Sequence, residues 1–137
     1  MAELDLQSGN IAAGVYENVS LKVPPGTHIH GRGVTLRGNG TDPVLIVDGG
    51  VVMMEGLRIE GPAPDGIKVK GGTVLLWDME IAGCGYGVRA VKDATANVRT
   101  VRTAFSRNAI GIHHVAAGAC DAHMTHFDGH GAAANPN

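Results

Sequence analysis

The chain has 137 residues, with 11 basic and 13 acidic side chains and a formal net charge of −2. This length predicts one domain with a buried core. The charge balance lacks the strong basic excess of nucleic-acid-binding proteins and therefore argues against that class. No run of about 18 apolar residues occurs, and residues 1–10 lack the basic and apolar regions of a signal peptide. We therefore expect no nucleic-acid partner, no membrane partner and one domain over 1–137. The sequence does not assign a localisation, although an extracellular or virion-associated protein fits the pattern described below.

The N-terminal part is predicted to contain a polar leader, followed by short strands separated by a turn. Residues 1–10 are polar and aperiodic, so they predict a leader that frays. Residues 11–23 alternate loosely, and Pro24-Pro25-Gly26 then predicts a turn, because proline lacks a donor and glycine permits positive φ. Short strands are expected at 27–31 and 34–37.

From residue 44 onward the expected strands come in sets of three. Each has about four residues rich in Val, Ile and Leu, bounded by turn formers, and no window keeps a helical period without a glycine break. The expected strands are 44–47, 51–54 and 57–60; 67–70, 74–77 and 79–82; 88–91, 96–99 and 101–104; and, more weakly, 110–115, 119–122 and 124–127. Residues 131–137 are small and polar and predict a flexible tail.

A repeat organises these strands. The phrase at 57–60 returns at 79–82, 101–104 and 124–127, in steps of 22, 22 and 23 residues. Such a period indicates a solenoid, and three short strands per step indicate an all-β, single-stranded, right-handed parallel β-helix of about five coils. Two inward columns are predicted: Leu57, Met79, Val101 and Met124, and then Ile59, Ile81, Thr103 and His126.

The repeat, with the phrases Ile11–Val19 and Val34–Gly38, resembles the pectin-lyase-like right-handed β-helix superfamily. This group includes pectate lyases, polygalacturonases, pectin methylesterases, alginate epimerases and phage tailspikes. The resemblance spans about residues 11–130 and concerns the fold, which does not determine function. Gly129-His130-Gly131 is similar to an element of polygalacturonases, but the paired carboxylates that hydrolysis needs are missing one coil earlier. No catalytic residue is therefore predicted.

The candidate ligand-binding residues are basic. Lys68, Arg89 and His113 follow one another at steps of 21 and 24 residues and alternate with apolar neighbours, so all three should point outward from one face. Lys70 lies on the same face as Lys68. Such a row could bind the carboxylates of an acidic polysaccharide, while the structural alternative is a solvated face that keeps the sheet soluble.

Other polar features favour structural roles. Arg37, Arg58, Glu80 and Arg102 predict a cross-strand charge ladder. Cys84 and Cys120 form no CxxC pair and predict buried free thiols.

The sequence assigns no metal and no cofactor, although the chain is unusually rich in histidine towards its end. A transition-metal site needs three or four converging ligands, and His123 and His126 are an odd number of residues apart, which would aim them at opposite faces of an unbroken strand. His28 and His30 share a face and could form a two-ligand clip for a divalent metal, completed by symmetry mates.

Three functional hypotheses follow. The favoured one is a non-catalytic module that binds acidic polysaccharide, and the alternatives are a small lyase or hydrolase and a structural unit such as a tail-fibre segment. Because an uncapped coil exposes strand edges, we also expect the chain to form a homo-oligomer or to be part of a longer protein.

Overall fold

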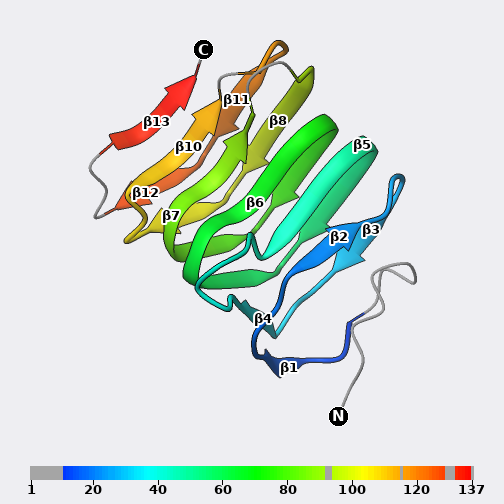
Figure 1. The fold of residues 1–137 in the computed structure, drawn as a ribbon, viewed down its shortest axis with the longest axis vertical. Coiled ribbons are helices and arrows are strands. Elements are labelled where there is room, and N and C mark those ends of the chain that lie inside the picture. The colour runs from blue at the N-terminus through cyan, green and yellow to red at the C-terminus, as the bar shows by residue number, and fades with distance from the viewer. Residues whose placement is uncertain (1–10, 92–93, 115, 129–131, 137) are drawn as a thin grey trace.

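The computed structural model describes residues 11–91, 94–114, 116–128 and 132–136, and folds them into a parallel β-solenoid of about five turns of about 22 residues (Figure 1). The described residues form strands and turns without a helix. The strands are β1 (Gly14–Tyr16), β2 (Leu21–Val23), β3 (His28–His30), β4 (Val34–Arg37), β5 (Leu45–Glu55), β6 (Arg58–Trp77), β7 (Glu80–Ala90), β8 (Ala96–Val101), β9 (Ala104–Ser106), β10 (Ile110–His114), β11 (Cys120–His123), β12 (His126–Asp128) and β13 (Ala132–Pro136). The predicted fold class is confirmed. In the described part of the chain, no helical segment has the length and apolarity needed to cross a bilayer.

Parallel pairing between successive coils produces three faces. Face A contains β1, β4, the starts of β6 and β7, β9 and β12. Face B contains β2, the start of β5, the middle of β6, the end of β7, β10 and β13. Face C contains β3, the ends of β5 and β6, β8 and β11. The long strand β5 runs from face B to face C, and β6 runs over all three faces; their pairing shifts register at the corners between Val47 and Val51 and between Glu60 and Ala63.

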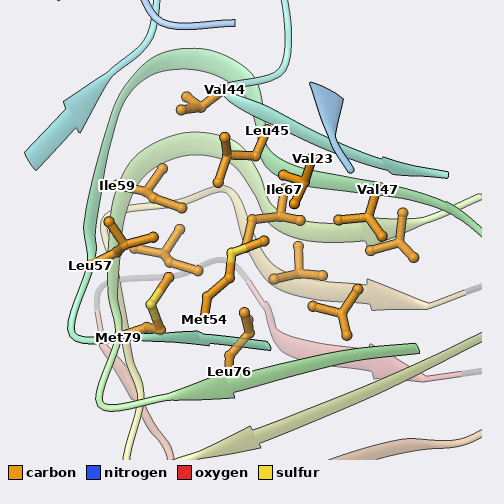
Figure 2. Close-up of a cluster of buried hydrophobic side chains, with 14 of the residues drawn as sticks. Val23, Val44, Leu45, Val47, Met54, Leu57, Ile59, Ile67, Leu76 and Met79 are labelled. Carbon is orange, nitrogen blue, oxygen red and sulfur yellow. The ribbon is translucent and has the colours of Figure 1, made fainter. Parts of the chain in front are cut away.

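Inward side chains stack from coil to coil and form the core. On face A, Leu36 is in register with Ile59, Ile59 with Ile81, Ile81 with Phe105 and Phe105 with Phe127. The first four are fully buried, and the two phenylalanine rings stack with centroids 5.1 Å apart. Figure 2 shows how Leu57, Ile59 and Met79 pack against the inward residues of faces B and C. Burying each such side chain contributes about 1.5–3 kcal/mol before entropy is subtracted.

The predicted inward columns are correct for two coils and wrong beyond them. Leu57 and Met79 are both buried, but Val101 is only half-buried and Met124 is 70% exposed. The column instead continues through Thr103, which is 1% exposed. In the second column, Thr103 and His126 are replaced by Phe105 and Phe127.

The shift arises at one corner. Val69 pairs with Ala90, whereas Gly72 pairs with Ala96, so two residues separate the paired positions in one coil and five in the next. The step between paired positions thus rises from 21 residues (Val69 to Ala90) to 24 (Gly72 to Ala96), which is two more than the 22-residue repeat and displaces the strands after this corner by two residues. Arg102 and Met124 lie at left-handed turn positions instead of inside strands.

The charged ladder on face A is also different from the predicted column. Arg37 is in register with Glu60, and Arg58 with Glu80, so two adjacent columns share the charges. Arg37 forms ion pairs with Glu60 at 3.1 Å and with Glu17 at 2.8 Å, and Arg58 forms one with Glu80 at 2.7 Å.

Arg102 is separate from this ladder. It lies at a turn and pairs with Asp78, the residue at the equivalent turn of the previous coil, at 2.8 Å.

Two further expectations concern the tail and the cysteines. Residues 131–137 were expected to form a flexible tail, but Ala132–Pro136 forms β13, which lies parallel to β10 (Figure 1). Both cysteines are free thiols, as predicted, but only Cys84 is buried, whereas Cys120 is half-buried.

Candidate functional site

Face B presents a row of basic side chains on three neighbouring strands. Lys68 of β6 is in register with Arg89 of β7, and Arg89 is in register with His113 of β10. Because each alternates with buried residues, the three side chains point outward at the strand spacing of about 4.8 Å. The predicted adjacency is therefore observed, and its role in binding stays a prediction.

A buried carboxylate anchors the centre of this row. Asp65 Oδ1 lies 2.9 Å from Arg89 Nε, and Arg89 Nη2 lies 3.1 Å from Asp65 Oδ2. The Asp65 side chain is 1% exposed, while that of Arg89 is 33% exposed. Arg89 thus covers the carboxylate and keeps part of its guanidinium at the surface.

Burial raises the pKa of Asp65, and the charges of Arg89, Lys68 and His113 oppose that shift. The direction follows because a carboxylate loses hydration when it leaves water, whereas nearby cations favour its ionised form. Asp65 therefore anchors Arg89, and the positive charges beside it partly offset the free-energy cost of burying its carboxylate.

An aromatic side chain completes the cluster. Tyr86, one coil after Asp65 and in register with it, lies under the guanidinium of Arg89, whose Cζ is 5.4 Å from the ring centroid. The centroid of the His113 ring lies 5.0 Å from that of Tyr86, and the two rings are tilted by 38°. Cation–π and ring contacts of this kind orient the Arg89 guanidinium and the His113 ring.

Two further lysines of face B lie near this row. Lys70 follows Lys68 on β6 and is exposed. Lys22 of β2 stands in the same register row two strands before Lys68, with Ile46 between them, and pairs with Asp48 at 3.6 Å. The outward row on face B therefore carries basic side chains on the first, third, fourth and fifth coils and is interrupted by Ile46 on the second.

Asp65 and Tyr86 were not among the residues that the sequence pattern singled out. Asp65-Gly66 has the composition of an ordinary turn, and Tyr86 lies between two glycines. Their separation of 21 residues matches that of Lys68 and Arg89, so the repeat itself contained the signal that places them side by side.

The remaining histidine predictions have different outcomes. His28 and His30 lie on one strand with ring centroids 4.1 Å apart, as their spacing predicts. His123 and His126 belong to separate strands, β11 and β12, and are both exposed. Gly129-His130-Gly131 lies outside the described residues.

Comparisons of the chain with models of protein families, with curated proteins and with solved structures give no match.

Proposed function

We propose that face B binds an acidic polysaccharide without modifying it, the basic row Lys68–Arg89–His113 and the neighbouring Lys70 contacting the carboxylates. The observation that carries this proposal is the register that aligns the three residues on consecutive strands. A repeating cationic row is suited to a repeating anionic polymer, since each strand adds one contact at a regular interval.

The composition of the cluster supports a polymer of sugars. Arg89 offers the planar donor geometry that matches a carboxylate, and Tyr86 adds an amphipathic ring beside it. The proposal also includes that the chain belongs to the pectin-lyase-like group and that its solenoid is right-handed. Two features support this: the chain forms a β-solenoid, and its basic face suits the acidic substrates of that group.

A hydrolase or lyase is less well supported by this cluster. Asp65 is the carboxylate beside the row, and it has no exposed surface from which to reach a glycosidic bond. General acid–base catalysis needs the group within hydrogen-bond reach of the substrate. The geometry therefore suits Asp65 to positioning Arg89.

Binding to polygalacturonate tests the proposal. Lys68→Glu should weaken the affinity at least about ten-fold, because it removes one cation and adds a like charge to the polymer's. Arg99→Glu is the matched control: Arg99 is exposed on β8 of face C, so the same charge change should leave the affinity within about two-fold. Isothermal titration at low salt measures both.

Two results would contradict the proposal. One is a wild-type protein that does not bind polygalacturonate while remaining folded. The other is an equal loss of affinity in Lys68→Glu and Arg99→Glu, which would indicate attraction by net charge alone. Neutral dextran, which has no carboxylates, should bind neither the wild-type protein nor the two variants.

A further inference from the structure

A second cluster of polar side chains, each able to act as a metal ligand, lies on face C. It uses other residues than the basic row. It joins His28 and His30 of β3 to Glu55 at the end of β5. Among the described residues these three form a group whose potential ligand atoms all lie within 4.8 Å of one another. Two imidazoles and one carboxylate are a common donor set for zinc and for other divalent transition metals.

The solenoid brings the third ligand to the first two. His28 and His30 are two residues apart on one strand, so both point outward while Ile29 between them is fully buried. Register places His30 directly opposite Glu55 of the next coil. Because strands in register are about 4.8 Å apart, a side chain on the neighbouring coil reaches the same point in space as the histidine pair.

Backbone bonds at both ends of β3 hold this arrangement. The amide of Met53 donates to Thr27 O at 3.0 Å, and the amide of Gly31 donates to Glu55 O at 2.9 Å. Ile29 anchors the middle of the strand in the core. Main-chain pairing thus determines the separation of the ligands before any ion arrives, which lowers the ordering entropy that binding would otherwise require.

The side chains are already turned toward one another. Glu55 Oε1 lies 3.6 Å from His28 Nε2 and is in contact with His30 Nδ1. The two histidine rings are 4.1 Å apart, and all three side chains keep between 37% and 51% of their surface exposed. An ion in solution can therefore reach them.

Space for further ligands lies beside the cluster. His30 and Glu55 also line an open cavity of about 220 Å³, whose other walls are Gly31, Arg32, Gly56 and Asp78. A metal with three protein ligands keeps a coordination position for water or another molecule. This cavity offers room for that fourth ligand.

We propose that His28, His30 and Glu55 form a site for one divalent transition-metal ion of the zinc type. The inference is independent of polysaccharide binding, because the site uses other residues on another face. In this site the chain's own next coil supplies the third ligand, so the histidine pair does not depend on symmetry mates for it.

Titration of the metal-stripped protein with Zn²⁺ tests the site. We expect one ion per chain with micromolar or tighter affinity. His28→Ala, His30→Ala and Glu55→Gln should each weaken binding at least about ten-fold, the scale on which even indirect changes at metal sites act. Co²⁺ should give visible absorption bands in the wild type that each variant diminishes.

A matched control separates this site from other histidines. The double variant His123→Ala/His126→Ala removes two exposed imidazoles from β11 and β12 and should keep the wild-type affinity. The proposal is overturned if Zn²⁺ does not bind at one ion per chain, if the three site variants bind as tightly as the wild type, or if the control loses as much affinity as they do. Because the ligands are exposed, each variant should keep the wild-type melting temperature, and one that unfolds is replaced by Glu55→Ala or His30→Gln.

Discussion

Asp65 and Arg89 form an ion pair in which the carboxylate is buried and the guanidinium reaches the surface, with Nε and Oδ1 2.9 Å apart. They are 24 residues apart in sequence and belong to consecutive coils. The pair therefore links the stability of the solenoid to the orientation of the basic row on face B.

The first prediction concerns the loss of this partner. Arg89→Met should lower the free energy of unfolding by about 2–4 kcal/mol, because it leaves the Asp65 carboxylate buried and unpaired; the upper part of the usual range is discounted because Arg89 is one-third exposed. The double variant Asp65→Asn/Arg89→Met should recover most of that loss. Urea unfolding measures both, and equal stabilities of the single and double variants would contradict the prediction.

The same pair predicts a pH dependence. Burial raises the pKa of Asp65 in the folded protein above its ordinary value of 3.8. The folded state then binds this proton more tightly than the unfolded chain, so the contribution of Asp65 to stability is largest below that ordinary value and falls as pH rises through the folded pKa. The free energy of unfolding should fall further with pH in Arg89→Met, which leaves Asp65 unpaired, than in Asp65→Asn/Arg89→Met, which has no titrating group at this position. A difference in unfolding free energy between these two variants that stays constant from pH 4 to pH 8 would rule this out.

Glu60 should show the opposite dependence. Burial opposes its ionisation, but a hydrogen bond from Arg37 and the charge of Arg58 outweigh that effect, so the pKa of Glu60 is lowered from its ordinary value of 4.5. Its stabilising contribution is present above that value and is lost as pH falls through the folded pKa. Glu60→Gln should destabilise by about 1 kcal/mol at pH 7.

The control for Glu60 is Glu17→Gln, at the 59% exposed end of the same ladder. It should change the unfolding free energy less, because exposed ion pairs are screened by water. Denaturant unfolding at pH 7 and pH 3.5 distinguishes the two variants. If Glu60→Gln were as costly at the lower pH, hydrogen bonding by the neutral side chain would be the cause.

Close packing between coils predicts the effect of a single methyl group. A Cβ at Gly87 would lie 2.5 Å from Gly111 O and 2.6 Å from Phe105 Cδ1, and neither the paired backbone nor the buried ring can move freely. Gly87→Ala should therefore destabilise by about 2–3 kcal/mol. At Gly71 the nearest atom is 3.9 Å away, so Gly71→Ala should change stability by less than about 1 kcal/mol. Similar thermal melting of the two variants would contradict this.

The two cysteines should differ in reactivity. Burial raises the pKa of the Cys84 thiol to about 12, and the charge of Asp65 adds to the shift. Cys120 is less buried, although burial raises its pKa as well. Because the thiolate is the reactive form, iodoacetamide at pH 8 should label Cys120 well before Cys84. Mass spectrometry of the labelled peptides follows both rates, and unfolding in urea should equalise them.

The repeat in the sequence determined the architecture. Short apolar strands separated by turn residues at a period of about 22 can bury their inward faces only by stacking coil on coil, which is why the solenoid and the outward direction of Lys68, Arg89 and His113 were predictable. Alternation along a strand is a local property, and so is the pairing of His28 with His30 on one face.

Register beyond the first coils was decided by the tertiary structure. The extra residues between Ala90 and Ala96 shift every later strand, so Phe105, not Thr103, packs on Ile81. The partners that give each candidate site its chemistry, Asp65 under Arg89 and Glu55 beside His30, come from neighbouring coils. Contacts between coils depend on the length of each corner, and the sequence pattern does not specify which corner residues are absorbed in a turn and which extend a strand.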